Sequence, residues 1–231
     1  METSRIAELL QPFLQFTPIS QSSKASPFRS GSGPEGSAVL SQSQLQHIST
    51  YIDLLLRWNA RVNLTAVREP EAIVTRHFGE SLFAARQLFP ALQSATEHVI
   101  DFGSGAGFPG LPMKIFAPHL RLTLIEANQK KGTFLREVVR KLALKDVEVF
   151  SGRAEDYVGQ ADVVTLRAVE HFEQALPLAL RLVCPGGRLA LLIGDAQVER
   201  ARELATGVRW SNPVEIPLST SRVLLTGTSA R

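Results

Sequence analysis

The spacing of hydrophobic residues changes near residue 98 and divides the chain into two parts. Before that point, apolar residues recur every three or four positions, a pattern typical of amphipathic helices. We expect helices over residues 5–16, from about 41 to 59, and from Pro70 onward. Pro12 limits the first helix, because proline cannot donate a helical hydrogen bond. Residues 1–95 are predicted to form an N-terminal helical extension.

Local signals support these boundaries. Ser41 and Gln44 have the spacing of a capping box, and Leu40 can pack against Leu45 as a hydrophobic staple. Pro70 is in place for a first-turn proline. Residues 20–37 (SQSSKASPFRSGSGPEGS) are rich in serine, glycine and proline, so we expect a loop or flexible linker there.

From residue 98 onward, short apolar strands alternate with helical segments. Runs such as DVVTL and LALLI are typical of a parallel sheet that is covered on both faces. Segments 208–217 and 222–226 are too close for a crossover, so they should form an antiparallel hairpin at one sheet edge. The other expected strands are 98–102, 121–126, 147–151, 161–166 and 188–193, and the helices are near 111–116, 130–144, 172–182 and 196–205. The predicted fold over residues 96–231 is Rossmann-like α/β: a seven-stranded, doubly wound, mostly parallel sheet with an antiparallel last strand.

Composition and charge narrow the class of protein. The chain has 231 residues, of which 44% are hydrophobic and 20% charged, as in soluble globular proteins. We expect no membrane span, no secretory signal and a cytoplasmic location. Cys184 is the one cysteine, so an internal disulfide is excluded, and we expect its side chain to be buried.

Basic residues are concentrated between residues 121 and 145. Seven of them stand there against Glu126 and Glu137: Arg121, Lys130, Lys131, Arg136, Arg140, Lys141 and Lys145. Such a cluster is compatible with nucleic acid as a partner, although a solvated helix face is the commoner explanation of a single run of charge.

The segment VIDFGSGAGFPG, residues 99–110, carries the candidate chemistry. An apolar strand ends at Asp101, and glycines follow at alternate positions, Gly103, Gly105 and Gly107. A turn of this kind lets a nucleoside cofactor lie against bare backbone. Glu126 follows about 20 residues later, where an acidic side chain binds ribose hydroxyls. The remaining candidate contacts are Ser104, Phe108, Ala127 and Asn128.

The turn favours a cofactor without phosphates. Phe108 occupies the place of the third glycine in a dinucleotide fingerprint, and Pro109 and Pro112 remove N–H groups that a pyrophosphate would need. S-adenosylmethionine fits this turn. Its ribose would bind Glu126, its adenine would pack on Phe108, and its ammonium would face Asp101. A nicotinamide cofactor, or a turn without any ligand, is the alternative, but the antiparallel last strand favours a methyltransferase.

Residues at other strand ends have two interpretations each. Ala154 and Glu155 follow the third strand and could hold the adenine edge or cap a surface helix. Arg167 ends the fourth strand, where it could position a substrate or form a structural ion pair. Arg153 and Arg222 could contact phosphates or remain solvated.

The absence of two catalytic motifs from the sequence narrows the choice of atom that is methylated. A pyrimidine-carbon methyltransferase needs a cysteine nucleophile, and an adenine-amine methyltransferase commonly has Asp/Asn-Pro-Pro-aromatic after the fourth strand. This chain has Leu-Arg-Ala-Val at 166–169 instead. An atom with a free lone pair, such as guanine N7, needs only in-line placement. We therefore expect Arg167 to position the substrate, with no general base and no metal.

Five motifs in order resemble the glucose-inhibited division protein B family. They are WNARVNLTAVREPEAIVTRHFGESL, DFGSGAGFPGLPMKI, LIEANQKKGTFLREV, SGRAEDY and TLRAV, within a resemblance that spans about residues 39–228. The chain departs from the family pattern in the 20–37 segment, which looks like an insertion, and at Ile193-Gly194, where the family usually has Lys-Gly.

The resemblance implies methylation of N7 of one guanine in 16S rRNA with S-adenosylmethionine. It implies cofactor contacts at Gly103, Phe108, Glu126 to Asn128, Ala154, Glu155 and Arg167. It places Asn63, Arg76, His77, Arg153 and Arg222 in RNA-facing or site-supporting segments, although a histidine on an apolar helix face is more often packed in a core. The expected substrate is 16S rRNA, free or in the small ribosomal subunit or its precursor, and the enzyme is expected to be a monomer.

Three other functions remain open from the sequence. A small-molecule methyltransferase of the same fold would have a deep apolar pocket under the helical cap. An NAD-dependent oxidoreductase would bind nicotinamide cofactor instead of S-adenosylmethionine. A binding module would keep the cofactor fold without turnover.

Overall fold

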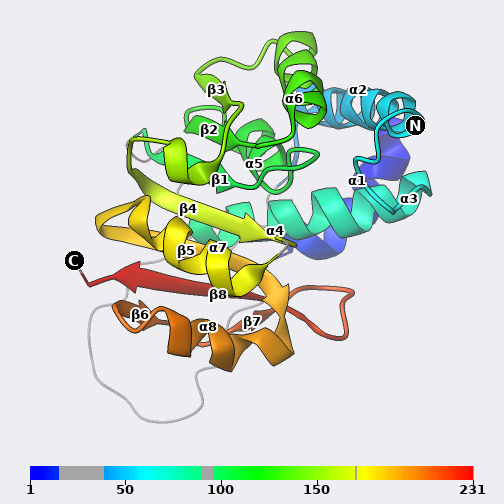
Figure 1. The fold of residues 1–231 in the computed structure, drawn as a ribbon. Helices are drawn as coiled ribbons and strands as arrows, with labels where there is room; N and C mark the ends of the chain where they lie inside the picture. The colour runs from blue at the N-terminus through cyan, green and yellow to red at the C-terminus, as the bar shows by residue number, and fades with distance from the viewer. Residues whose placement is uncertain (16–38, 90–95, 170, 231) are drawn as a thin grey trace.

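A single twisted sheet organises the molecule (Figure 1). The computed structural model describes residues 1–15, 39–89, 96–169 and 171–230, so the predicted loop at 20–37 lies outside the described residues. Within these, the strands are β1 (His98–Phe102), β2 (Arg121–Ile125), β3 (Val147–Phe150), β4 (Ala161–Arg167), β5 (Val183–Gly194), β6 (Val208–Trp210), β7 (Val214–Glu215) and β8 (Arg222–Ser229). Their order is β3-β2-β1-β4-β5-β8-β6, with β7 also paired to β8.

The strand directions confirm the predicted doubly wound sheet. β1 to β5 are parallel, and β8 runs antiparallel to β5 and β6. The sheet has eight strands rather than the predicted seven, because the segment expected as one strand over 208–217 divides into β6 and β7. Pro213 lies in the break and has no backbone donor for a ladder. β5 begins earlier than predicted and includes Cys184, which is half-buried there rather than buried.

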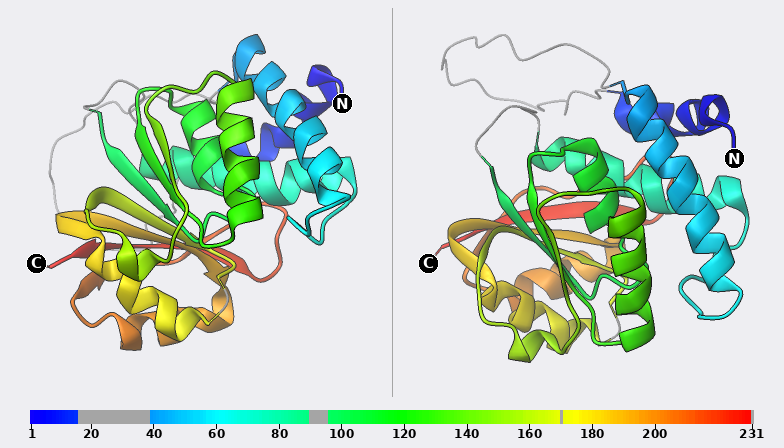
Figure 2. Two further views of the ribbon diagram at one scale, coloured as in Figure 1. Left: turned by 45° about the horizontal axis from the view of Figure 1, so that its top comes forward. Right: turned by 90° about the horizontal axis from the view of Figure 1, so that it is seen from above.

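Helices cover both faces of the sheet (Figure 2). They are α1 (Thr3–Leu14), α2 (Gln42–Asn59), α3 (Pro70–Ile73), α4 (Glu80–Leu88), α5 (Gly110–Phe116), α6 (Gln129–Lys141), α7 (Phe172–Arg181) and α8 (Val198–Leu204). Neighbouring residues of a strand alternate between two cores: Val163 packs with α1 to α6, whereas Val164 packs with α7 and α8. Side chains of successive strand residues point to opposite faces, so apolar runs serve both cores.

The N-terminal helices share a core with the sheet. Ile6 of α1, Leu82 of α4 and Leu192 of β5 belong to one buried cluster. The domain boundary near residue 95 therefore stays a prediction, because the packing runs across it. No helix in the described part of the chain is long and apolar enough to cross a membrane.

The start of α2 confirms the predicted capping box. The Ser41 hydroxyl accepts from the Gln44 N–H at 3.2 Å, and the Gln44 side chain accepts from the Ser41 N–H at 2.8 Å. Gln44 also donates to the carbonyl of Ile115 at 2.9 Å, which ties α2 to α5. Leu40 and Leu45 are buried in the same core.

The helical run that begins at Pro70 is irregular. α3 is followed by a π-helical turn, Val74–Gly79, and then by α4. Such wide turns occur frequently at functional sites, because they change the direction of side chains within a helix. The turn carries Arg76 and His77, and Glu80 follows directly.

Candidate functional site

A cavity of about 630 Å³ lies at the carboxyl ends of β1, β2 and β4. This is where a doubly wound sheet binds its ligand. The described residues around it come from the glycine turn, from Glu126 to Asn128, and from Arg167 to Val169, with Leu64, Thr65 and His77 from the N-terminal part. The cavity therefore joins segments that are up to about 100 residues apart in the sequence.

Gly105 and Gly107 have different roles in the turn. Gly105 has φ of +57°, and a Cβ built on it would meet only the Gly103 carbonyl, at 3.8 Å, so the space above it is open. Gly107 has φ of +88°, and a Cβ there would collide with the side chains of Tyr51 and Leu111. Gly105 thus leaves room in the cavity, whereas Gly107 allows α2 and α5 to pack beneath the turn. Gly107 is not among the cavity-lining residues.

Asp101 supports the turn from below. It is fully buried, its carboxylate accepts from the Gly110 N–H at 3.1 Å, and it accepts from the Thr165 hydroxyl at 2.9 Å. Burial raises the pKa of Asp101 to about 6. Asp101 is not among the cavity-lining residues, so its geometry fits a support for the turn better than the expected contact with an ammonium. Ser104 lines the cavity and donates its hydroxyl hydrogen to the Asp101 carbonyl at 2.9 Å.

Glu126 is held in place by two backbone donors. Its carboxylate accepts from the Gly105 N–H at 2.8 Å and from the Asn128 N–H at 2.7 Å, one at each oxygen. Each carboxylate oxygen has a second lone pair, which is free to accept from a ribose hydroxyl. Asn128 in turn caps α6 by accepting from the N–H groups of Lys130 and Lys131, at 3.0 and 3.2 Å. The sequence-predicted pair of glycine turn and acid is thus one hydrogen-bonded unit.

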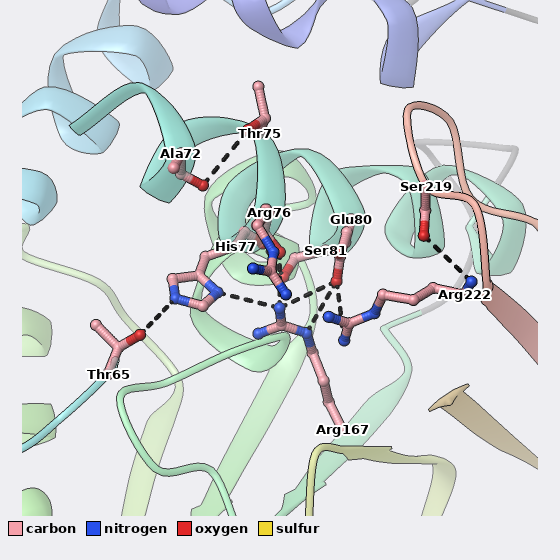
Figure 3. A network of polar contacts seen from close by, with 10 residues as sticks. All are labelled: Thr65, Ala72, Thr75, Arg76, His77, Glu80, Ser81, Arg167, Ser219 and Arg222. Atoms are coloured by element: carbon pink, nitrogen blue, oxygen red, sulfur yellow. Dashed lines mark hydrogen bonds and ion pairs between the residues drawn. The ribbon is translucent and has the colours of Figure 1, made fainter. Parts of the chain in front are cut away.

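Arg167 also lines the cavity, and two of its three guanidinium nitrogens, Nε and Nη2, form hydrogen bonds (Figure 3). Its guanidinium donates to one oxygen of Glu80 at 3.0 Å, to the Arg76 carbonyl at 2.6 Å and to His77 Nδ1 at 3.0 Å. Arg222 binds the same Glu80 oxygen at 3.2 Å. The structural ion pair is confirmed, and because Arg167 also lines the cavity, its role in positioning a substrate stays a prediction.

His77 is a neutral acceptor at this site. A guanidinium can only donate, so Nδ1 accepts and the ring hydrogen is on Nε2, which donates to the Thr65 hydroxyl at 2.8 Å. Burial, and then the positive charge of Arg167, lowers the pKa of His77 to about 3. Thr65 also accepts from the Val67 N–H at 3.1 Å, so its hydroxyl hydrogen is left to donate elsewhere. His77 is packed, as the sequence pattern suggested, and it also lines the cavity.

Phe108 lies at the cavity wall with little of its ring exposed. The ring stacks with Tyr51 at a centroid distance of 5.4 Å and with His77 at 4.8 Å. Phe78 meets it edge-on at 5.2 Å. Only 6% of the residue is accessible, so the expected packing of adenine on an open Phe108 face stays a prediction.

Other predicted residues lie outside this cavity. Ala154 and Glu155 form a short turn after β3, and neither they nor Arg153 line it. Asn63 is exposed beside the lining residues Leu64 and Thr65. Their proposed contacts with cofactor or RNA stay predictions. From the basic segment, only Lys131 reaches the cavity among the described residues.

Glu80 and Thr65 were missed by sequence reasoning. Glu80 is 3% exposed and holds two arginines from distant strands. The sequence contains a signal for Glu80, because Arg76 and His77 stand four and three positions before it and so share one face of a helix with it. That spacing could not reveal Arg167 and Arg222 as partners, since only the fold brings β4 and β8 to this helix.

Comparison with known proteins identifies the family. The sequence model of the family described as rRNA small subunit methyltransferase G matches residues 44–219 of this chain. The chain belongs to this family. A Ribosomal RNA small subunit methyltransferase G from Chloroflexus aggregans is 42% identical over 200 residues, which covers 80% of this chain and 82% of that one. One from Stenotrophomonas maltophilia is 41% identical over 183 residues, covering 77% and 84%.

Solved structures share the fold at low identity. The P. horikoshii TYW2 complex with MeSAdo has a TM-score of 0.54 at 17% identity, over 67% of this chain and 63% of that chain. The ribosomal protein L11 methylase of Lactobacillus delbrueckii subsp. bulgaricus has a TM-score of 0.55 at 11% identity, over 66% and 80%. Fold and family together confirm the sequence prediction of an S-adenosylmethionine-dependent rRNA methyltransferase.

Proposed function

We propose that this protein methylates N7 of a guanine in 16S rRNA. The observation that carries the proposal is the set of titratable groups at the cavity. Among the described lining residues these are His77, Glu126, Lys131 and Arg167. Nδ1 of His77 accepts from Arg167, and Glu126 accepts from two backbone donors. His77 and Arg167 bind each other, and the free lone pairs of Glu126 are assigned to the ribose, so the proposal gives none of these three groups a role in proton removal. This suits a nucleophile that already has a free lone pair.

Guanine N7 is such a nucleophile. Its lone pair lies in the major-groove edge and takes no part in Watson–Crick pairing. Attack by N7 requires alignment with the methyl group, and alignment alone supplies a large part of the rate of such reactions. An exocyclic amine or a pyrimidine carbon would need further chemistry that this cavity does not offer.

The residues present fit the cofactor. S-adenosylmethionine supplies a methyl group on a sulfonium, which needs no metal to be transferred. The open backbone at Gly105 leaves room for the nucleoside, and the free lone pairs of Glu126 suit its two ribose hydroxyls. Arg167 to Val169, at the end of β4, form the opposite wall, where Arg167 can position the guanine.

The proposed substrate context is the small ribosomal subunit or its precursor, with the enzyme acting as a monomer in the cytoplasm, where ribosomes assemble. A guanine within structured RNA must be unpaired or flipped to reach a cavity at the sheet edge. The basic residues of α6, Lys131 among them, would then contact backbone phosphates, which makes binding depend strongly on salt.

The test is mass mapping of 16S rRNA from a strain that lacks this enzyme. We expect one N7-methylguanosine to disappear and to return when purified enzyme and S-adenosylmethionine are added to small subunits from that strain. An unchanged modification pattern contradicts the proposal. Methyl transfer to a metabolite, with none to rRNA, would favour a small-molecule methyltransferase instead.

A further inference from the structure

A second hollow, of about 320 Å³, lies beside the cofactor cavity. It is formed by the π-helical turn on one side and by the loop between β7 and β8 on the other. Its polar lining includes Arg76, Glu80, Ser219, Thr220 and Arg222. Arg167 faces the cofactor cavity and Arg222 faces the second hollow, yet both bind the same oxygen of Glu80. One carboxylate therefore links a lining residue of the cofactor cavity to a lining residue of the second hollow.

The cluster around this carboxylate has an excess of positive charge. Three guanidinium groups, those of Arg76, Arg167 and Arg222, are close enough to His77 to disfavour its protonation. Among the described residues, Glu80 is the one acidic residue that lines the second hollow, and Glu126 is the one that lines the cofactor cavity. Its side chain is 4% exposed and already binds Arg167 and Arg222. Figure 3 shows these two guanidinium groups meeting at Glu80.

Arg76 is the free cation of the cluster. Its side chain is exposed, and within the described part of the chain it forms no ion pair. Hydroxyl donors lie nearby in the same hollow. Ser219 accepts from the Arg222 N–H at 3.1 Å, so its own hydrogen is left to donate, and Thr220 lies beside it. Guanidinium and hydroxyl donors around one space are the groups that bind a phosphate.

We propose that Arg76 and Arg222 bind one backbone phosphate of the RNA in this hollow. The proposal rests on the proposed function, and it places the phosphate next to the nucleotide whose guanine enters the cofactor cavity. A carboxylate could use the same donors, and the cofactor has one. Arg76 and Arg222 do not line the cofactor cavity, so the RNA phosphate is the better match.

The experiment uses Arg76→Gln, which removes the charge and leaves the backbone carbonyl that accepts from Arg167. The matched control is Arg209→Gln, because Arg209 is exposed on β6 and pairs with Thr228, at the opposite end of β8 from Arg222. Binding to small subunits from a strain without the enzyme is measured over a range of salt concentrations, and affinity for S-adenosylhomocysteine is measured by calorimetry.

We expect Arg76→Gln to reduce the slope of log affinity against log salt by about one and to weaken binding severalfold, as the loss of one phosphate contact does. Arg76→Lys should restore the slope, since it restores the charge. Arg209→Gln should leave the slope unchanged, and cofactor affinity should stay the same in all three variants.

Two results would overturn the inference. A slope in Arg76→Gln equal to that of the wild type would show that no phosphate binds there. A loss of S-adenosylhomocysteine affinity in Arg76→Gln would assign the cluster to the cofactor carboxylate. Failure of the proposed function is a separate result, because it appears in the wild-type enzyme as absence of methyl transfer to small subunits.

Discussion

At the scale of single residues, the glycine turn separates ligand space from packing space. Gly105 faces open space and Gly107 faces side chains, although both have positive φ and stand two positions apart. The chain between them turns over Ala106, whose carbonyl accepts from the buried Tyr51 hydroxyl. Residues that look equivalent in the motif therefore have different roles, and variants should separate them.

Gly105→Val should abolish cofactor binding while the protein still folds. The added side chain enters the cavity, and a left-handed φ costs a side-chain-bearing residue about 1–2 kcal/mol. Gly107→Ala should lower the free energy of unfolding further, because its Cβ collides with Tyr51 and Leu111. Calorimetry with S-adenosylhomocysteine and denaturant unfolding measure the two effects. Equal losses of binding and stability in both variants would contradict this division.

His77 should make stability depend on pH. Its pKa is about 3 in the folded protein and 6.5 in the unfolded chain, so the folded state holds the ring neutral. The stabilisation is fully present above pH 6.5 and is lost as pH falls toward 3. We expect the free energy of unfolding to fall more steeply below pH 6.5 in the wild type than in His77→Asn. Parallel curves for the two proteins would show that the ring is not held neutral.

At the scale of elements, the helical run 70–88 connects the N-terminal part to the catalytic edge of the sheet. Its π-helical turn places Arg76 and His77 beside Arg167, and the start of α4 adds Glu80. The Gly79 backbone approaches the ring of Phe13 so closely that a Cβ would lie 2.5 Å from it. The run is thus fixed by α1 on one side and by an ion-pair network on the other.

Glu80→Gln should destabilise the protein by about 3 kcal/mol, because breaking a buried ion pair leaves arginines without their counter-charge. Glu71→Gln is the control on the same run, since Glu71 pairs with Arg5 at an exposed position and should change stability little. Denaturant unfolding measures both. If Glu80→Gln were as stable as Glu71→Gln, Glu80 would not be what holds Arg167 and Arg222.

At the scale of the whole molecule, the helical part and the sheet share one hydrophobic core. Leu82 of α4 and Leu192 and Leu224 of the sheet are each no more than 1% exposed and share a core. The polar contacts also cross between the parts, as where Arg188 of β5 donates to the Leu88 carbonyl at 2.6 Å. The N-terminal helices therefore pack on one sheet face, and we predict that they do not fold as a separate unit.

A fragment of residues 96–231 should fail to fold stably, since removing α1 to α4 exposes the apolar sheet face that Leu192 and Leu224 occupy. The full chain should unfold in one transition. Circular dichroism and thermal unfolding of both proteins provide the measurement. A soluble fragment with its own cooperative transition would establish two independent domains.

The sequence predicted the mostly parallel sheet with its antiparallel last strand, the glycine turn and Glu126, because each depends on a local pattern. The hydrophobic periodicity that identifies strands and helices depends on neighbouring residues. The glycine turn and Glu126 have a fixed spacing because they belong to one strand–helix–strand unit. The division of 208–217 into β6 and β7 was not predicted, although Pro213 was visible. Glu80 was overlooked because its partners are 87 and more residues away.

The amino-acid sequence by itself determined the fold class, the family and the pairing of the glycine turn with Glu126, since all three depend on short motifs whose residues are near one another in the chain. Only the tertiary structure decided which of the predicted residues share a cavity. It buried Asp101 and Gly107 outside the cavity lining, and it brought Arg76, Arg167 and Arg222 together around Glu80. The physical reason is that burial and ion pairing depend on packing between distant segments, which no local pattern specifies.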